Sequence, residues 1–243
     1  MNDIIAGVEL PDTEATTEAT RLVAEMTNPL LFHHSRRVFL LGSLQARRLG
    51  LEPDPELLYL AAMFHDAGLL TPFSTAAQRF ELDGADHARR FLLERGFSAQ
   101  SADVVWGAHA RHTTPEGPRG LGPPCAVSPP PPGPGAGPPP APPTTPEVPG
   151  RMGPEIAATN LGVLTDVIGI GLDDLSPDAV EEITAVHPRG DFKKGFLDAF
   201  REGLKDRPHT TYGTVNADVL EHFVPDFRRG SMVERILNSP WSA

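Results

Sequence analysis

The chain has 243 residues, a formal net charge of −11 and one cysteine, Cys125. This length suits one domain with a sizeable core. The acidic balance makes nucleic acid and anionic membrane surfaces poor candidate partners, and a single cysteine excludes an intramolecular disulfide or a cysteine-based zinc site. No signal-like segment opens the chain, and no apolar run approaches the ~20 residues that a transmembrane helix needs. We therefore expect a soluble, cytoplasmic protein.

Helical periodicity predicts the elements outside one unusual segment. The first two helices are expected over 12–26, capped by Asp12-Thr13, and over 30–49. Asp54-Pro55-Glu56 provides an N-cap, a proline at the first helical position and an acidic first turn for a third helix, which carries His65-Asp66. No alternating strand pattern of useful length is present, so the predicted fold class is all-α, a single-domain helical bundle. The remaining helices are expected near 84–95, 98–111, 154–170, 177–186, 191–205, 215–223 and 231–238.

The segment 117–149 interrupts this pattern because it is rich in proline and glycine. Such a stretch cannot build a core, and we expect exposed polyproline II or disordered chain. Similar tetrapeptides, Thr113-Thr114-Pro115-Glu116 and Thr144-Thr145-Pro146-Glu147, flank most of it. We interpret it as a late insertion or an artefact of the gene model, with a ligand for SH3-type or WW-type domains as the alternative. It would divide one domain into the parts 1–116 and 150–243.

The candidate chemistry centres on His65-Asp66, which follows the apolar run 57–64. A charged aspartate at the inner end of an apolar helix costs several kcal/mol unless something pairs with it, and a divalent cation is the usual solution. His34 and Asp166 stand on two other predicted helices. A bundle can bring all four side chains to one ion. Each residue alone is a weak candidate, but two carboxylates in apolar helices need a common partner.

These residues and their neighbours resemble the HD-domain superfamily of metal-dependent hydrolases, and most closely its cyanamide hydratase-like branch. The superfamily resemblance rests on His34-Ser35-x-Arg37-Val38, on Ala62-Met63-Phe64-His65-Asp66-Ala67-Gly68 and on the downstream Asp166. The branch is suggested by Arg79-Phe80-Glu81-Leu82-Asp83-Gly84-Ala85, His112-Thr113-Thr114-Pro115, Gly169-Ile170-Gly171 and His187-Pro188-Arg189-x-Asp191-Phe192-Lys193. The resemblance implies that His34, His65, Asp66 and Asp166 are the metal ligands.

Further residues are candidates for completing the site. His112 is a candidate proton donor and Thr113 a candidate hydroxyl over the metal, with His109 as the competing histidine. Glu81 is a candidate general acid/base or a partner that orients a ligand imidazole, unless it is an exposed first-turn residue. His87 occupies the place of an extra ligand in some two-metal relatives, although its setting favours a surface residue.

Other charged residues and histidines are interpreted without a site role. Arg36-Arg37 and Lys193-Lys194 are expected to lie on solvated helix faces, and His33 and His187 are expected to be structural.

The expected reaction is addition of water to cyanamide or a similar small nitrile-like substrate through a metal-bound hydroxide. One divalent ion is expected, with zinc first and iron, manganese or nickel also compatible. The partner is a small molecule, and the sequence does not indicate an oligomeric state. Two alternatives stay open: a phosphohydrolase acting on a nucleotide or another phosphate ester, and an inactive metal-binding interaction module.

Overall fold

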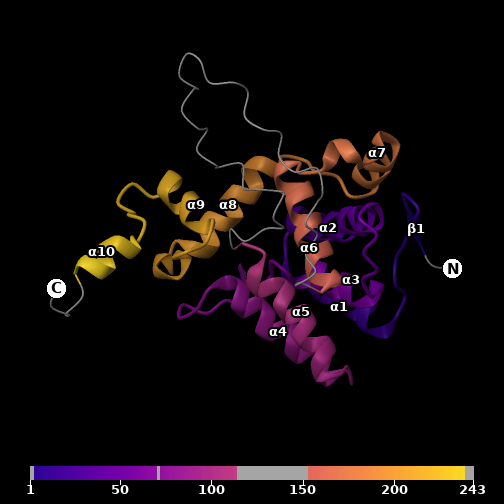
Figure 1. Cartoon of the computed structure of the whole chain (residues 1–243), viewed down its shortest axis with the longest axis horizontal. Coiled ribbons are helices and arrows are strands. Elements are labelled where there is room, and N and C mark those ends of the chain that lie inside the picture. The colour runs from indigo at the N-terminus through magenta and orange to yellow at the C-terminus, as the bar shows by residue number, and fades with distance from the viewer. Residues whose placement is uncertain (1–2, 70–71, 114–152, 239–243) are drawn as a thin grey trace, which may run out of the picture.

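The computed structural model describes residues 3–69, 72–113 and 153–238, and helices dominate these parts of the chain (Figure 1). The all-α prediction is confirmed, while the predicted insertion 117–149 lies outside the described residues. A small antiparallel hairpin of β1 (Ile4–Ile5) and β2 (Val8–Glu9) was not expected. The helices are α1 (Glu14–Met26), α2 (Pro29–Arg48), α3 (Pro55–Phe64), α4 (Phe80–Glu94), α5 (Ala99–Arg111), α6 (Pro154–Ile168), α7 (Pro177–Val186), α8 (Phe192–Leu204), α9 (Asn216–Phe223) and α10 (Met232–Leu237).

The first three helices begin where local capping chemistry predicts. The side chains of Thr13, Asn28 and Asp54 each accept a hydrogen bond from a backbone N–H in the first turn that follows. Two boundaries differ from the prediction. Helix α3 ends at Phe64, so His65-Asp66 lie in the turn that follows it and not within the helix. Helix α4 begins at Phe80, about four residues earlier than expected, without a side-chain cap.

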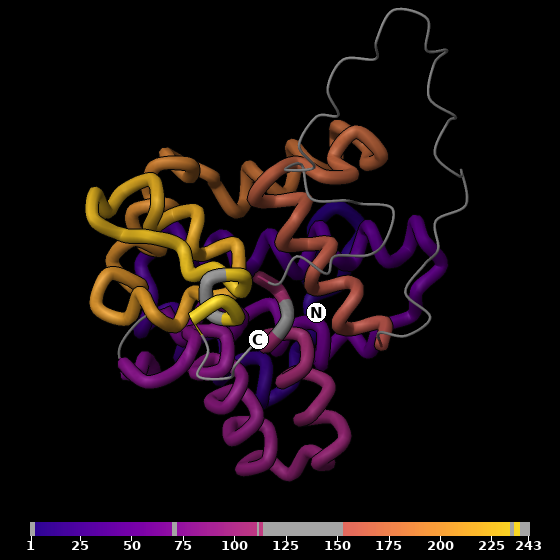
Figure 2. Tube along the Cα trace, turned by 60° about the vertical axis from the view of Figure 1, so that its left-hand side comes forward, coloured from indigo at the N-terminus to yellow at the C-terminus, as the bar shows by residue number. Residues whose placement is uncertain are grey.

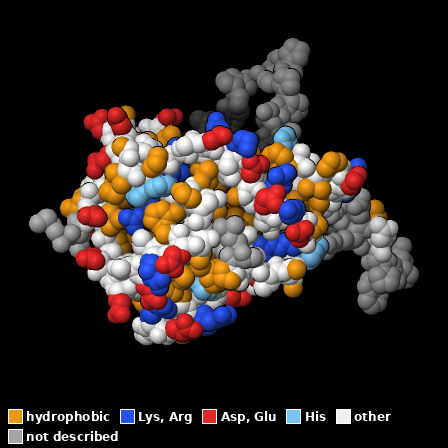
Figure 3. Space-filling model, turned by 180° about the vertical axis from the view of Figure 1, so that it is seen from behind, with side chains coloured by type: hydrophobic (Ala, Val, Ile, Leu, Met, Phe, Trp, Pro, Cys, Tyr) orange, Lys and Arg blue, Asp and Glu red, His pale blue; other side chains and the backbone are white. Residues whose placement is uncertain are grey.

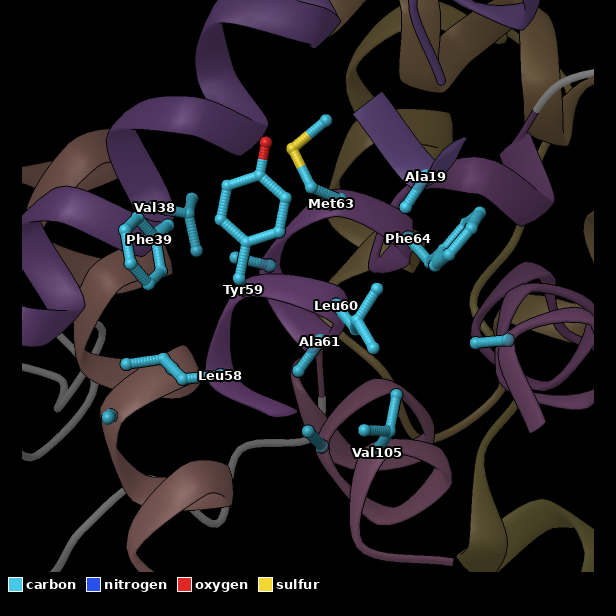
Figure 4. Close-up of a cluster of buried hydrophobic side chains, with 14 of the residues drawn as sticks. Ala19, Val38, Phe39, Leu58, Tyr59, Leu60, Ala61, Met63, Phe64 and Val105 are labelled. Atoms are coloured by element: carbon cyan, nitrogen blue, oxygen red, sulfur yellow. The ribbon is translucent and has the colours of Figure 1, made fainter. Parts of the chain in front are cut away.

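Helix α3 occupies the centre of the main core. All its residues from 58 to 64 are buried, and they contact α1, α2, α5 and α6. Figure 4 shows side chains of α3 beside Val38 and Phe39 of α2, Ala19 of α1 and Val105 of α5. Because α3 is covered on all sides, the turn after Phe64 begins in the interior. His65-Asp66 are therefore buried.

Helices α2 and α6 pack together through two glycines. A Cβ atom on Gly162 would lie 2.1 Å from the backbone oxygen of Val38, and one on Gly42 would lie 2.5 Å from that of Ala158. Only residues without a Cβ atom allow the two helix backbones to come this close. The contact fixes α2, which carries His34, against α6, which carries Asp166.

Substitution of Gly162 by alanine is therefore expected to destabilise the protein by about 2–3 kcal/mol, even though alanine is the better helix former. The new methyl group meets backbone, so the helices must separate. Gly107→Ala in α5 is the matched control, because its Cβ would meet only the flexible end of Ile156, at 3.2 Å. Guanidinium chloride unfolding of both variants tests this, and equal stability of the two would contradict it.

The C-terminal helices α8 and α9 form a second apolar cluster with the region around α4. This cluster consists of Leu69, Phe80, Phe200, Leu204 and Leu220. Figures 1 and 2 show α8, α9 and α10 gathered on one side of the molecule, with α4 and α5 as a separate helical pair. Acidic, basic and apolar side chains are interspersed on the face shown in Figure 3.

Arg207 joins the C-terminal part of the chain both to α4, through a buried ion pair, and to the turn after α3, through a hydrogen bond. Arg207 donates to the Asp83 carboxylate at 2.6 Å and to the carbonyl of Gly68 at 2.7 Å. Both charged side chains are almost fully buried. Since Gly68 lies two residues after Asp66, this hydrogen bond fixes the segment that follows His65-Asp66.

Candidate metal centre

Three side chains converge in the interior between α2 and the end of α3. Nε2 of His34 lies 3.1 Å from Nε2 of His65, and Oδ2 of Asp66 lies 3.2 Å from the latter and 3.6 Å from the former. All three residues are buried. Two imidazoles and one carboxylate at such distances form the donor set of a divalent-ion site, and the ligand atoms of these residues lie within 4.8 Å of one another.

The backbone after Asp66 turns sharply because Gly68 packs directly against the start of α4. A Cβ atom at Gly68 would lie 1.9 Å from the carbonyl oxygen of Phe80 and 2.6 Å from the backbone nitrogen of Gly84. The glycine in His65-Asp66-Ala67-Gly68 therefore permits contact between the turn and α4. This contact brings the first turn of α4, which includes Glu81, beside His65-Asp66.

Hydrogen bonds on the far side of each imidazole orient the rings. Nδ1 of His65 lies 2.8 Å from the carbonyl oxygen of Ala62, and Nδ1 of His34 lies 2.6 Å from Oδ2 of Asp166. A carbonyl or a carboxylate can only accept, so each Nδ1 carries the hydrogen. In the neutral rings both Nε2 atoms are then unprotonated, and their lone pairs face each other. This is the arrangement by which outer partners prepare histidines for a metal.

The electrostatics of the cluster favour a positive charge between these groups. Burial disfavours the charged form of His65, but the adjacent Asp66 carboxylate outweighs it and raises the pKa of His65. Burial would likewise raise the pKa of Asp66, yet the charge of His65 holds it well below its usual range. Neither oxygen of Asp66 has a hydrogen-bond partner among the described residues. A buried carboxylate without donors is costly unless a cation joins it.

Asp166 lies on the opposite side of His34 from this cluster. Its Oδ2 accepts from Nδ1 of His34, and its two oxygens accept from Nε and an Nη of Arg37 at 2.8 and 3.0 Å. Arg189 also donates to its carboxylate. Burial opposes ionisation, but the bonds from His34 and Arg37 lower the pKa of Asp166. The structure thus brings Asp166 to the ring of His34 and not into the three-residue cluster, and its role as a direct ligand stays a prediction.

Arg37 corrects the interpretation of Arg36-Arg37 as a solvated helix face. The Arg37 side chain is fully buried, whereas Arg36 is only partly buried and lies against Tyr59. Arg37 stands three residues after His34 and therefore on the same face of α2. Besides Asp166, it donates to the carbonyl oxygens of His187 and Pro188 at 3.2 and 3.0 Å.

The predicted residues His112, Thr113 and Glu81 lie together beside the cluster. Nε2 of His112 lies 3.6 Å from Oδ1 of Asp66, and its Nδ1 donates to the carbonyl of His109 at 2.7 Å. Thr113, the next residue, donates from its hydroxyl to Oε1 of Glu81. Glu81 is fully buried, which contradicts the alternative of an exposed first-turn residue. Asn216 from α9 also donates to Oε1 of Glu81, at 2.8 Å.

The other histidines have different surroundings. His109 donates from Nε2 to the carbonyl of Ala61 at 2.8 Å, and burial lowers its pKa to about 3, so it is a neutral link between α5 and α3. His87 is only partly exposed, because its ring packs against Phe64 and Phe73. His87 is thus half-buried at the surface and not fully solvated. Burial lowers its pKa to about 4.

Aromatic rings cover the site on the side of α8. The rings of Phe192 and Phe196 each lie 5.2 Å from that of His34, and Phe200 continues the row from Phe196 at 4.5 Å. Phe80 contacts both Phe200 and His112. These rings give the centre an apolar border, beside which charges interact strongly.

The residues present fit a divalent ion. The Nε2 atoms of His34 and His65 lie 3.1 Å apart, and the buried Asp66 carboxylate beside them has no hydrogen-bond partner among the described residues. His34, His65 and Asp66 would hold the ion, and His112 faces the same space. Histidine nitrogen with carboxylate oxygen suits zinc, iron, manganese or nickel.

Sequence reasoning missed two residues that join this site. Arg37 could have been found, because its position three residues after His34 puts both on one helix face. Asn216 has no comparable signal: it stands in a polar stretch with no motif around it. Only the folded chain brings it to Glu81, which is 135 residues away in the sequence.

The sequence model of the HD domain family matches residues 31–148. This range contains His34, His65, Asp66, Glu81, His112 and Thr113, and it ends before Asp166. No curated protein matches the chain. Among the described residues, no helix is both long and apolar enough to cross a membrane. An HD domain implies metal-dependent chemistry of the hydrolase type. The family match, together with the helical fold and the His34, His65 and Asp66 cluster, supports assignment of the chain to the HD-domain superfamily.

Proposed function

We propose that the protein is a metal-dependent hydratase that adds water to cyanamide or a similar small nitrile-like substrate. In this reaction the water oxygen bonds to the nitrile carbon and a proton reaches the nitrile nitrogen. No leaving group departs, and the product from cyanamide is urea. The observation that carries the proposal is the meeting of Glu81, Thr113 and His112 beside the cluster, because the hydratase-like motifs contributed these residues.

The bound ion would be held by His34, His65 and Asp66 and, when present, would lower the pKa of a water molecule toward neutrality. The chain's own groups then have distinct tasks. His112 keeps its Nδ1 hydrogen on the carbonyl of His109, so its Nε2 is left to take up or deliver a proton next to Asp66. Glu81 orients the hydroxyl of Thr113.

The surroundings of the centre favour a small uncharged substrate over a phosphate ester. Phosphoryl transfer gains from cationic side chains that neutralise phosphoryl oxygens. Arg37 and Arg189, which border His34 through Asp166, are both bound to that carboxylate. The ring of Phe196 contacts His34, and the ring of Phe80 contacts His112.

Urea release by metal-loaded protein tests this proposal. The protein is loaded with zinc, iron, manganese or nickel and incubated with cyanamide, beside a panel of nucleotides and with metal-stripped protein as the control. We expect metal-dependent formation of urea and no release of phosphate. Nucleotide turnover without urea would select a phosphohydrolase instead. Stoichiometric metal with no turnover of either class would indicate a binding module.

A further inference from the structure

We propose that Glu81 and Asn216 bind the amino group of the substrate. This inference rests on the proposed function and makes it more specific, because it states which part of the small molecule the protein recognises. Cyanamide carries an –NH2 group on its nitrile carbon, whereas an alkyl nitrile of the same size carries a methyl group there.

The hydrogen bonds around Glu81 fix the orientation of the Asn216 amide. A carboxylate accepts and does not donate, so the atom of Asn216 that lies 2.8 Å from Oε1 of Glu81 is the amide nitrogen. The amide oxygen, Oδ1, therefore points elsewhere. A backbone hydrogen bond of 3.2 Å from Val215 to the carbonyl of Thr113 holds the start of α9 in this position.

Two acceptor atoms remain without a donor in this buried group. Oε2 of Glu81 and Oδ1 of Asn216 have no hydrogen-bond partner among the described residues, although their side chains are almost fully buried. Buried acceptors without donors cost free energy, and such atoms in a native protein point to a ligand or water that donates to them. The two side chains are joined by one hydrogen bond, so the two acceptors belong to one buried polar group.

The two acceptors select the chemistry of that ligand. With Glu81 as a carboxylate, a group with two hydrogens on one small centre can donate to both acceptors, and a primary amino group has this form. A phosphate would place its oxygens against oxygens, which is unfavourable. A methyl group would fill the space but leave both acceptors unsatisfied, and a site built to bind N–H discriminates strongly against such an analogue.

The place of this group relative to the metal cluster fits the proposed reaction. Thr113 donates to Glu81, and the preceding residue, His112, faces Asp66. In this proposal the amino group binds at Glu81 and Asn216, and the nitrile carbon attached to it is directed toward His112 and the cluster.

Binding of the product and of its methyl analogue tests the proposal without turnover. Urea and acetamide differ in one –NH2 group that is replaced by –CH3, and calorimetric titration or competition measures their affinity for zinc-loaded protein. We expect urea to bind about 10- to 100-fold more tightly. In Asn216→Leu, which is similar in volume, this preference is expected to fall to within about threefold, while a purely structural role would weaken both ligands equally.

A second variant and a kinetic measurement keep the test independent of folding failure. Glu81→Gln retains the shape of the side chain but offers N–H in place of an acceptor, so it should also abolish the preference for urea. Cyanamide hydration should exceed that of N,N-dimethylcyanamide, with a smaller ratio in Asn216→Leu. Circular dichroism confirms that each variant is folded.

The outcomes separate the two proposals. If cyanamide is not hydrated but urea is still preferred through Asn216, the hydratase reaction is wrong and amino-group recognition stands. If cyanamide is hydrated while urea and acetamide bind equally, or the preference survives both substitutions, the role of Glu81 and Asn216 is wrong. Binding of water alone at these atoms would give that second result.

Discussion

Asp66→Ala and His65→Ala are expected to lose the bound metal ion and about 1000-fold or more of the activity. Each substitution removes one of three buried ligands, and loss of the ion removes several kcal/mol of transition-state stabilisation. Elemental analysis of purified protein gives the metal content, and urea release gives the activity. Asp103→Ala is the matched control, because Asp103 is an exposed aspartate paired with Arg89 outside the site. Stoichiometric metal in both site variants would contradict a metal centre at this position.

Metal-free protein gives a second readout of the same substitution. The carboxylate of Asp66 is buried and has no hydrogen-bond donor among the described residues. Without metal the carboxylate is balanced by the adjacent His65, so metal-free Asp66→Ala should lose only the stability of that pair and melt a few degrees below metal-free wild type. Metal should raise the melting temperature of wild type and leave that of the variant unchanged. A large loss of stability in the metal-free variant would instead indicate a structural aspartate.

Arg37→Leu is expected to destabilise the protein by about 3–5 kcal/mol, because it removes a buried cation that donates two hydrogen bonds to the buried Asp166 carboxylate. The arginine makes two hydrogen bonds to that carboxylate, both with buried atoms. The adjacent Arg36→Leu is the control, since Arg36 is partly buried and contacts Tyr59 instead. Guanidinium chloride unfolding of the metal-loaded proteins measures both effects.

The double variant Arg37→Leu/Asp166→Leu distinguishes a lost ion pair from lost packing. Removing both charges should recover much of the stability lost in Arg37→Leu, because an apolar pair can replace a buried ion pair at little cost. Without Asp166, however, Nδ1 of His34 has no acceptor there, and metal affinity should fall about 10- to 100-fold. Additive losses of stability in the double variant would contradict this account of the pair.

The sequence predicts most helices because their signals are local. Thr13, Asn28 and Asp54 cap helices within three residues of themselves, and proline and glycine mark further starts and ends. The start of α4 was predicted too late because no side chain caps it. Its first residue, Phe80, is defined by contacts with α8 and with His112, which come from distant parts of the chain.

In the candidate site, too, local signals could be recognised in the sequence, whereas contacts between distant residues could not. His65-Asp66 could be identified because an apolar run ends in a charged residue, and His34 because a motif surrounds it. The partners that orient these residues could not be identified by such means. Asp166 bonds to His34 across 132 residues, and Asn216 bonds to Glu81 across 135. Burial of Arg37 depends on the same distant partners, so its charge alone suggested a solvated position.

The glycine contact between α2 and α6 has a consequence for the order in which the site forms during synthesis. His34, His65 and Asp66 all emerge before α6, but the acceptor that orients His34 arrives only when Gly162 reaches α2 and carries Asp166 with it. All three candidate ligands are thus synthesised before α6, but the His34 ring is oriented only after Asp166 has reached it. The chain between α5 and α6 connects α6 to the helices before it. Because the entropy of closing a connection grows with the logarithm of its length, halving or doubling that length changes the cost by only about 0.6 kcal/mol. Lengthening this connection therefore costs far less stability than a single methyl group on Gly162.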